Sequence, residues 1–588
     1  MLFLASIEQS FTTNLKLLIY LQKPNFIFQY FSDNFQSMEM IEVNLGETRT
    51  ITVQPGQKII EIVKQALPHN RYKPYIVIRN NTFTSFNEIV NEPTKISLLR
   101  HFHESSRRAY ESAAILILNY VVEDLYPDQR LIVMHSMCDG VFCRFVNEDF
   151  CTPQVIQEIS AAFIKVVEAD YAIEPLLISC NDARRYFKEI GQKDTEELLK
   201  YSEANFVTLY QINGRRFWLL SPPAPCTGLI KVFEIRPYQK GFVLRCPTEG
   251  DDRRLRPFTD QARLYEIFQE TEEWGRILEI STVADLNRTI VENQISDLIK
   301  IDEALHEKKI ASIADQISNK GERRFVFVAG PSSSGKTTFA KRLAIQLRVL
   351  GFKPLLLSLD NYFRDRAELA KLQGKRINYE VLDAIDLELL NDHLQRLLRG
   401  ETITPPVYNF ITGTKTPATK PMKIDSQTIL IFEGIHGINP GLTPEVNERY
   451  KFKIYVSALT HLNFDHMNRV RTHDTRLLRR IVRDYKYRGY SAAETIEMWK
   501  KVVEGENKYI FTFQGNADIM FNSSLVYEHG VLKTLAVTML KNVPENHHSY
   551  PEAQRLLDML SYFLPVEDTE IPPTSIMREF IGKSSFTY

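Results

Sequence analysis

A glycine-rich stretch that ends in a lysine and two threonines has the most specific chemistry in the chain. Gly330, Gly335, Lys336 and Thr337 occupy the fixed positions of the pattern G-x-x-x-x-G-K-[ST]. The glycines allow backbone angles that turn successive N–H groups toward a polyphosphate, the lysine adds positive charge, and the threonine hydroxyl can ligate Mg²⁺. The pattern therefore predicts a nucleoside triphosphate site. Its predicted residues are Gly330, Pro331, Ser332, Ser333, Ser334, Gly335, Lys336, Thr337 and Thr338.

Two carboxylates follow hydrophobic runs further along the chain. Asp360 follows the run 354–359, and Glu433 follows the run 428–432. In doubly wound sheets, ligands bind outside the carboxyl ends of the strands, so we expect both carboxylates near the phosphate loop. Asp360 is predicted to take the proton of an acceptor hydroxyl, with a helix cap or an outer Mg²⁺ ligand as the alternative. Glu433 is predicted to hold Mg²⁺, with a sheet-end carboxylate as the alternative.

A basic helix is predicted after a further hydrophobic run, residues 452–456. Arg476, Arg479, Arg480 and Arg483 follow the spacing i, i+3, i+4, i+7, which places them on one helix face. Runs of charge are usually solvated faces, and this is the alternative. Phosphoryl transfer depends on charge stabilisation, so we interpret the face as a lid over the phosphates. The predicted catalytic residues are Asp360, Lys336, Arg476, Arg480 and Arg483.

The segments around these residues alternate between strand and helix patterns. Residues 325–329 are hydrophobic and precede the loop, and residues 338–350 follow it with a helical pattern that stops at Gly351. Such an order predicts βαβ units and a mainly parallel sheet. The five predicted strands are 325–329, 354–359, 428–432, 452–456 and 518–521.

Residues 322–530 resemble the uridine kinase/phosphoribulokinase family. The motifs that carry the resemblance occur in family order: 330–338, Asp-Asn-Tyr-Phe-Arg at 360–364, Tyr-Asn-Phe at 408–410, Phe-Glu-Gly at 432–434, and 474–484. The resemblance implies an α/β P-loop kinase with a parallel five-stranded core and a helical lid, using ATP and Mg²⁺. It matches Asp360 to the general base, Lys336 and Thr337 to the triphosphate and Mg²⁺ groups, and Glu433 to the metal acid. The candidate substrate residues are Tyr362, Glu380, Tyr408 and Phe410.

Two positions depart from the uridine kinase pattern. Gly413 stands where those kinases carry a histidine that reads the base, and Glu380 stands where they carry an aspartate that holds the ribose. Loss of a base-reading donor changes specificity by about 1–3 kcal/mol. The resemblance implies a nucleoside acceptor such as uridine or cytidine. Pantothenate or a sugar phosphate stays open as the alternative.

The first part of the chain predicts two further domains. Residues 41–45 and 48–53 alternate as strands around Gly46-Glu47, and residues 57–67 follow as a helix. This opening resembles the β-grasp TGS domain. Residues 101–260 predict an α+β unit with a helix at 105–122 and a hairpin at Asn213-Gly214.

The α+β unit resembles the second N-terminal domain of threonyl- and alanyl-tRNA synthetases. Those domains carry an H-x-x-x-H pair, but here Arg107 follows His103 at the second position. No C-x-x-x-H pattern follows near Cys226, so the convergent ligands that zinc or editing chemistry needs are not expected. We interpret the unit as a retained scaffold.

The whole chain is predicted to be multidomain and resembles longer bacterial nucleoside-kinase-like proteins with TGS and threonyl-tRNA-synthetase-like domains. Residues 1–37, ahead of Met38 and Met40 as alternative starts, carry no assigned function. The predicted segments are an N-terminal extension 1–37, a TGS-like β-grasp domain 38–100, a synthetase-like α+β domain 101–260, a helical linker 261–320, a P-loop kinase domain 321–540, and a C-terminal helix and tail 541–588.

The composition is typical of a soluble globular protein and argues against a nucleic-acid-binding or membrane protein. The chain has 588 residues, of which 44% are hydrophobic and 25% charged, as in soluble globular proteins. A net charge of −1 argues against a protein-wide field for nucleic acid, and no run reaches about 18 uninterrupted apolar residues. Six cysteines without a C-x-x-C pair indicate free thiols in a reducing compartment. We expect a cytoplasmic protein with no membrane partner and leave a homo-oligomer open.

Two functional hypotheses from different classes remain. The first is an ATP- and Mg²⁺-dependent phosphotransferase that acts on a hydroxyl of a small, nucleoside-like acceptor. The second is an RNA- or ribosome-associated regulatory NTPase whose N-terminal modules bind RNA or tRNA. Against the second, no N-K-x-D motif follows the loop and no basic stripe precedes residue 300. A kinase-like fold with only a binding role is a third alternative.

Overall fold

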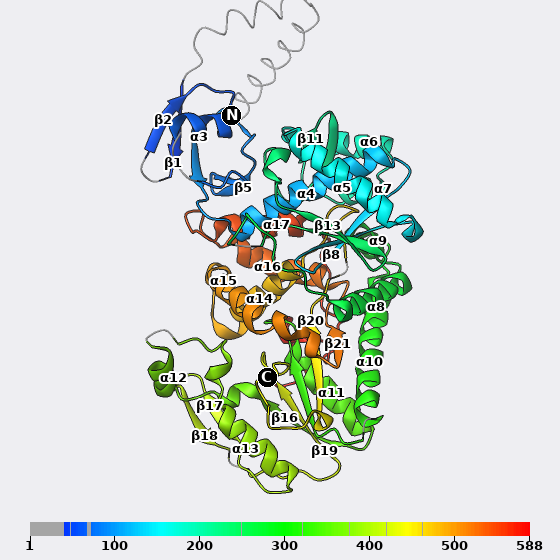
Figure 1. Ribbon diagram of the computed structural model, residues 1–588, viewed down its shortest axis with the longest axis vertical. Helices are drawn as coiled ribbons and strands as arrows, with labels where there is room; N and C mark the ends of the chain where they lie inside the picture. The colour runs from blue at the N-terminus through cyan, green and yellow to red at the C-terminus, as the bar shows by residue number, and fades with distance from the viewer. Residues whose placement is uncertain are drawn as a thin grey trace, which may run out of the picture.

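The chain folds into three regions that follow one another in sequence (Figure 1). The computed structural model describes residues 40–46, 49–67, 72–248, 250–319, 321–374, 377–418, 420–460 and 462–587. The expected extension 1–37 lies outside these residues. Within the described part of the chain, no helix is long and apolar enough to cross a membrane.

The first region is a five-stranded sheet with one helix. β1 (Ile41–Leu45) pairs antiparallel with β2 (Arg49–Val53) and parallel with β7 (Thr94–Leu98). β4 (Val77–Arg79) and β5 (Thr82–Thr84) complete the order β2-β1-β7-β4-β5. The predicted hairpin and helix are present, and the assignment of this region to the TGS family stays a prediction.

The helix of this region, α3 (Ile59–Ala66), begins later than the predicted residue 57. Gln57 and Lys58 instead form the short strand β3, which pairs with β6 (Ile89–Val90). The α3 residues that lie against the sheet are buried, as a period of 3.6 residues requires. They are Ile59, Ile62, Val63 and Ala66.

The second region contains two antiparallel sheets around a long helix. The sheets have the orders β13-β14-β9-β8 and β10-β11-β12. The helix α4 (Glu104–Leu125) shares a buried core with strands of both sheets. The other elements are β8 (Leu131–Met137), β9 (Gly140–Phe145), α5 (Pro153–Glu168), β10 (Glu174–Ser179), α6 (Cys180–Glu189), α7 (Lys193–Lys200), β11 (Phe206–Ile212), β12 (Arg215–Trp218), β13 (Glu234–Tyr238) and β14 (Gly241–Arg245).

The predicted hairpin of this region is confirmed. Asn213 and Gly214 connect β11 to β12 with φ angles of 45° and 85°. Both angles lie in the left-handed region, which a two-residue turn of this type requires. The likeness of the region to synthetase domains stays a prediction.

Three helices connect the second region to the third. They are α8 (Ala262–Leu278), α9 (Val283–Val291) and α10 (Ile295–Asn319), and α10 runs along one side of the lower sheet in Figure 1. The Nζ atom of Lys309 lies 2.7 Å from a carboxylate oxygen of Glu270, which joins α10 to α8. Arg342 donates to Glu307 over 2.7 Å and joins the third region to α10. The predicted helices at 261–320 therefore pack on the sheet that follows.

The third region is built on a parallel sheet of five strands, as predicted. The order is β16 (Lys353–Ser358), β19 (Thr428–Glu433), β15 (Phe325–Ala329), β20 (Lys451–Ser457) and β21 (Ile519–Asn522). All five residues of the central strand β15 are buried. Because the strands are parallel, the residues after β15, β16 and β19 lie at one edge. The predicted loop and base follow β15 and β16, and the predicted metal acid Glu433 is the last residue of β19.

Helices cover both faces of this sheet, and further helices lie between it and the second region (Figure 1). A hairpin, β17 (Pro406–Asn409) with β18 (Thr414–Pro417), lies on the same side as α12 and α13. The helices are α11 (Lys336–Val349), α12 (Arg366–Gln373), α13 (Leu387–Leu398), α14 (Thr472–Arg488), α15 (Ala492–Tyr509), α16 (Glu528–Lys541), α17 (Tyr550–Ser561) and α18 (Arg578–Ile581).

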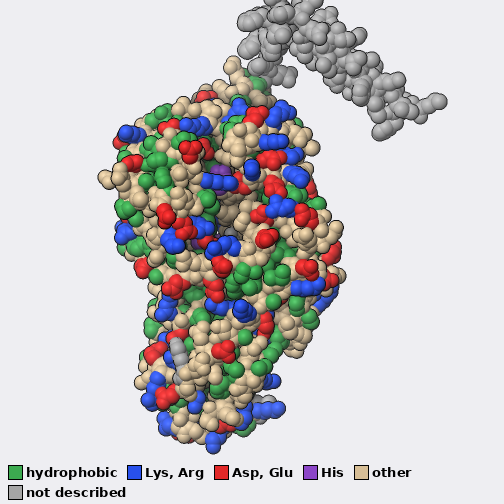
Figure 2. All heavy atoms as spheres, turned by 90° about the vertical axis from the view of Figure 1, so that its right-hand side faces the viewer, with side chains coloured by type: hydrophobic (Ala, Val, Ile, Leu, Met, Phe, Trp, Pro, Cys, Tyr) green, Lys and Arg blue, Asp and Glu red, His purple; other side chains and the backbone are tan. Residues whose placement is uncertain are grey.

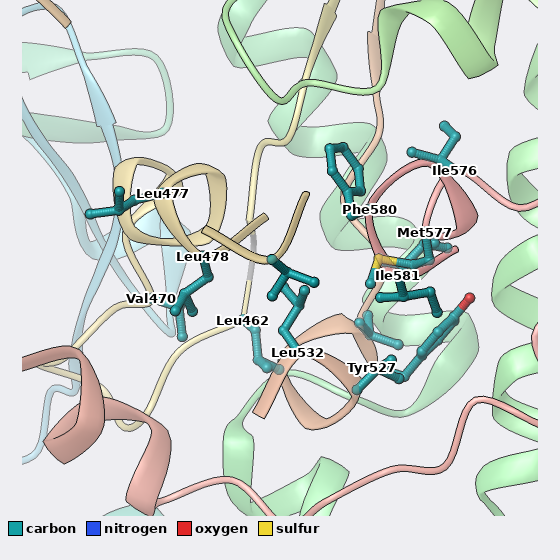
Figure 3. Packing of buried hydrophobic residues seen from close by; sticks show 14 of the residues in the cluster. Leu462, Val470, Leu477, Leu478, Tyr527, Leu532, Ile576, Met577, Phe580 and Ile581 are labelled. Atoms are coloured by element: carbon teal, nitrogen blue, oxygen red, sulfur yellow. The ribbon is translucent and has the colours of Figure 1, made fainter. Parts of the chain in front are cut away.

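The end of the described chain packs into the core of the third region (Figure 3). Ile576, Met577 and Phe580 are fully buried and belong to one hydrophobic cluster with residues of α14 and α16. Tyr527 and Leu532 lie beside them in the same cluster. The C-terminal segment is therefore part of the packed structure of this region.

The face of the molecule drawn in Figure 2 carries both signs of charge. Lys and Arg side chains are interspersed with Asp and Glu side chains across this face. The balance agrees with the formal net charge of −1. This face therefore does not offer the single-sign field that attracts nucleic acid.

Candidate active site

The phosphate loop connects β15 to α11 through backbone that only glycine can adopt at two points. A Cβ atom at Gly330 would lie 1.9 Å from the carbonyl oxygen of Val456. Gly335 has a φ of 81°, and a Cβ atom there would lie 2.6 Å from Ile576. The hydroxyl oxygens of Ser333 and Ser334 are buried and have no hydrogen-bond partner. Close backbone packing and unpartnered hydroxyls fit a loop that receives a polyphosphate.

The lysine and the first threonine of the loop lie beside the predicted metal acid. Lys336 folds back and donates from Nζ to the carbonyl oxygen of Pro331 over 3.0 Å. Thr337 donates from Oγ1 to Oε2 of Glu433 over 3.4 Å. Burial raises the pKa of Glu433, while the charge of Lys336 opposes that rise. A hydroxyl beside a carboxylate is a suitable oxygen pair for Mg²⁺.

Asp360 lies in the short 3-10 helix Leu359–Tyr362 that follows β16. Its N–H donates to Oγ of Ser358 over 3.3 Å, which fixes the turn after the strand. Burial first and the negative charge of Glu433 second raise the pKa of Asp360 to about 7, against the charge of Lys336. These interactions bring Asp360 into the same electrostatic environment as the loop lysine and Glu433. A carboxylate with a pKa near 7 can accept a proton at neutral pH.

Two lid arginines reach the phosphate loop from α14. Arg480 donates from Nη1 to Oγ of Ser332 over 2.8 Å, and Arg476 donates from Nε to the carbonyl oxygen of Ser332 over 2.9 Å. Both guanidinium groups also lie over the ring of Trp499 on α15, at 5.9 Å and 5.2 Å from its centroid. Positive charge from the predicted lid helix therefore lies against the loop.

The other two arginines of the predicted face have different partners. Arg479 is fully buried and donates from Nε to Glu528 over 2.6 Å, so it ties α14 to α16 in the core. Arg483 donates from Nε and Nη2 to Asp484 over 2.9 Å and 2.7 Å. Arg480 also pairs with Asp484 over 3.1 Å. Arg476 and Arg480 therefore reach the loop, Arg479 lies in the core, and Arg483 is held by an ion pair within α14.

Comparison with known proteins identifies the family of the third region. The model of the phosphoribulokinase/uridine kinase family matches residues 325–527. A uridine kinase of Mycoplasma pneumoniae is 33% identical over 178 residues, which cover 30% of this chain and 74% of that protein. The chain belongs to the phosphoribulokinase/uridine kinase family. A uridine kinase of Ligilactobacillus salivarius is 29% identical over 217 residues, which cover 37% of this chain and 92% of that protein.

Among solved structures, a phosphoribulokinase from Rhodobacter spheroides is similar at 21% identity with a TM-score of 0.24. That match covers 34% of this chain and 70% of the other. The family match lies within the residues 322–530 that the motifs indicated, and it leaves the first two regions outside.

An aromatic cluster lies where the kinase motifs suggested an acceptor pocket. The rings of Tyr408 and Phe410 meet edge to face with centroids 5.1 Å apart, and Phe363 lies 5.7 Å from Tyr408. The hydroxyl of Tyr379 lies 3.2 Å from that of Tyr408. The Phe410 side chain is 52% exposed, so the cluster ends in an accessible ring. Exposed aromatic faces of this kind can pack against a planar ligand.

An arginine fills the space beside Gly413, one of the two positions that differ from the uridine kinase pattern. A Cβ atom at Gly413 would lie 2.6 Å from Nε of Arg366. Arg366 donates from Nη2 to the carbonyl oxygen of Phe410 over 2.6 Å, and its own N–H donates to the carbonyl oxygen of Gly413 over 2.7 Å. The chain therefore has a guanidinium next to Gly413, the position where the family resemblance implied a base-reading histidine.

The structure shows the surroundings of two further candidate substrate residues, Tyr362 and Glu380. Tyr362 is buried in the core, and its hydroxyl lies 3.2 Å from Nδ1 of His393. The ring of Tyr362 therefore packs against His393 of α13, and its role at the substrate stays a prediction. Glu380 lies against Gly505 of α15, and burial, followed by the charge of Glu506, raises its pKa. Glu380 therefore stays a candidate at the edge of the site.

Two carboxylates at the loop were missed in the sequence. Glu506 accepts a hydrogen bond from the N–H of Ser332 over 2.7 Å and also pairs with Arg476. Glu579 accepts from the N–H and the hydroxyl of Thr338 over 3.2 Å and 2.7 Å. Neither residue stands in a motif, and each reaches the loop only through the packing of α15 or α18.

Proposed function

We propose that this protein is an ATP- and Mg²⁺-dependent kinase that phosphorylates a hydroxyl of a small molecule. A nucleoside such as uridine or cytidine is the first candidate acceptor. The observation that carries the proposal is the meeting of Asp360, Lys336 and Glu433 at one sheet edge, where Arg480 of α14 also contacts the phosphate loop. Membership of the phosphoribulokinase/uridine kinase family supports the same reaction class.

In the proposed mechanism, the loop N–H groups and Lys336 bind the triphosphate. Thr337 and Glu433 provide the oxygens that would hold Mg²⁺, and the bound ion would supply positive charge to the phosphates. Asp360 takes the proton of the acceptor hydroxyl while that oxygen forms its bond to the terminal phosphorus and displaces ADP. Arg476 and Arg480 stabilise the negative charge of the transferred group.

The acceptor pocket is proposed from the aromatic cluster. A planar base can pack against Phe410 and Tyr408, and Arg366 adds a cation beside the same rings. Glu380 is proposed to accept hydrogen bonds from sugar hydroxyls. These features favour a nucleoside over pantothenate, whose chain has no planar ring to fill such a cluster.

The test is a screen of the purified full chain with ATP and Mg²⁺. Nucleosides, pantothenate and sugar phosphates are offered separately, and the products are identified by mass. We expect a phosphorylated nucleoside, with ADP formed in equal amount. Phosphorylation of pantothenate or a sugar phosphate alone would support the kinase and reject the proposed acceptor. ATP hydrolysis that RNA stimulates, without any phosphorylated acceptor, would reject the kinase in favour of the RNA-associated alternative.

A further inference from the structure

Residues 576–581 pack against the phosphate loop, where Ile576 lies beside Gly335. Ile576, Met577, Phe580 and Ile581 are buried in the core of the third region. Lys486 of the lid helix donates from Nζ to the carbonyl oxygen of Ile581 over 2.6 Å. Figure 3 shows these side chains directed into the cluster that contains residues of α14 and α16. The backbone of this segment is therefore held in place by four apolar side chains and a lysine.

Glu579 is the member of this segment whose side chain turns toward the loop. It accepts two hydrogen bonds from Thr338, from the N–H over 3.2 Å and from Oγ1 over 2.7 Å. Thr338 lies in the first turn of α11, where N–H groups have no partner within the helix. Those same groups bind phosphate when a phosphate loop is loaded. The Glu579 carboxylate therefore occupies donors that a nucleotide needs.

Nearby positive charge holds the Glu579 carboxylate at Thr338, and its partial burial allows the side chain to rotate away. Its negative charge lies near Lys336 and at the positive end of α11, which stabilises it when no phosphate is bound. Glu579 itself is only partly buried, whereas its neighbours Arg578 and Phe580 are buried. A rotation of one side chain can therefore free Thr338 while the anchored backbone stays in place.

We propose that Glu579 competes with the nucleotide for Thr338 and so sets the nucleotide affinity of the site. The inference rests on the proposed function for the identity of the ligand. One N–H donates to one strong acceptor at a time, so a phosphate can take Thr338 only after the carboxylate has left. Two negative groups at one helix end also repel each other. The chain thus carries its own competing anion at the phosphate loop.

Glu506 differs from Glu579 in its freedom to move. It also accepts from a loop N–H, that of Ser332, but its side chain is 1% exposed and pairs with Arg476. A buried charge with this partner is strongly held, because removing it would leave the arginine unpaired. Glu506 therefore fixes the loop, whereas Glu579 is the carboxylate that can be exchanged for phosphate.

The test measures binding of a non-hydrolysable ATP analogue by calorimetry with the full chain. Glu579→Gln keeps the shape but removes the charge, and Glu579→Ala removes the acceptor as well. We expect the dissociation constant to fall about 5–30-fold in Glu579→Ala, with a smaller fall in Glu579→Gln, since charge-assisted hydrogen bonds are about twice as strong as neutral ones. Glu567→Gln is the matched control, because this exposed residue precedes the segment in the chain and carries the same charge.

An unchanged or weaker affinity in both Glu579 variants, with an unfolding temperature equal to that of the parent protein, would overturn the inference. If only Glu579→Ala has a lowered unfolding temperature, Glu579→Gln decides: tighter binding in that variant supports the inference, and unchanged or weaker binding overturns it. Tighter binding without any phosphorylated acceptor would support the inference and reject the kinase. Phosphorylation by the parent protein with no gain in affinity in the variants would reject only the role of Glu579.

Discussion

Arg480 donates from its Nη1 atom to the hydroxyl oxygen of Ser332 over 2.8 Å, so the lid helix α14 touches the phosphate loop. The contact joins two segments that are 148 residues apart in sequence. It places a guanidinium beside the groups that would hold the terminal phosphates.

Asp360→Asn tests the proposed base. The amide keeps the size of the side chain but cannot accept the acceptor proton, so we expect turnover to fall ~10²–10⁴-fold. Binding of the ATP analogue should persist, because the loop and Lys336 are unchanged. Steady-state turnover and calorimetry on the same preparation measure the two effects. Full turnover in this variant would remove Asp360 from the chemistry.

The pH dependence of the reaction should show the raised pKa of Asp360. Burial and the charge of Glu433 raise this pKa to about 7, so at lower pH the carboxyl is protonated and cannot act as a base. We expect kcat/KM for the acceptor to rise with pH and level off above about 7. Residual activity of Asp360→Asn should lack this step. An acid limb near pH 4 would instead indicate an ordinary, solvated carboxylate.

Arg480→Ala tests the lid. Removing one preorganised cation from the transferred phosphoryl group should lower kcat ~10²–10³-fold. Lys501→Ala is the control, since this exposed residue lies on the neighbouring helix α15 and carries the same charge. We expect the control to keep its kcat. Equal kcat values for the two variants would show that Arg480 takes no part in phosphoryl transfer.

A buried ion cluster connects the second region to the start of the lid helix. Glu111 of α4 accepts from Arg469 over 2.9 Å and from Arg471 over 3.0 Å. Burial alone would raise the pKa of Glu111, but Arg471 and Arg469 lower it to about 2. A carboxylate with a lowered pKa stabilises the fold above its unfolded pKa of 4.5, and this stabilisation is lost as the pH falls toward 2.

Glu111→Gln should therefore weaken the fold. The buried Arg469 and the partly buried Arg471 would lose this charged partner, and we expect a loss on the order of 3 kcal/mol in the free energy of unfolding. Glu168→Gln, on the exposed side of α5, is the control with the same chemical change. Urea unfolding of the full chain at neutral pH measures both variants. Identical midpoints would show that the cluster contributes no net stability.

The sheet and the phosphate site were accessible from sequence because their signals are local. The pattern around Gly330 and Lys336 defines the loop within eight residues, and Asp360 and Glu433 follow directly after hydrophobic strands. The strand bounds in the structure differ from the predicted ones by at most one residue at either end. Parallel pairing then brings these groups to the same edge without further information.

Residues that act through long-range packing were not accessible in this way. Glu506 and Glu579 meet the loop across 174 and 241 residues of sequence, and no spacing rule connects such pairs. Helical periodicity correctly grouped the arginines of α14, but it could not assign Arg479 to the core, because its partner Glu528 lies on another helix. The aromatic motif likewise did not indicate that Arg366 would fill the space beside Gly413.

The most direct test of the account follows the fate of the terminal phosphoryl group in water enriched with oxygen-18. Full-length protein, ATP, Mg²⁺ and a nucleoside are incubated, and the acceptor and inorganic phosphate are both examined by mass spectrometry. The account predicts a phosphorylated nucleoside without the heavy isotope, formed in step with ADP. ADP formed together with labelled inorganic phosphate, and an unmodified acceptor, would contradict it.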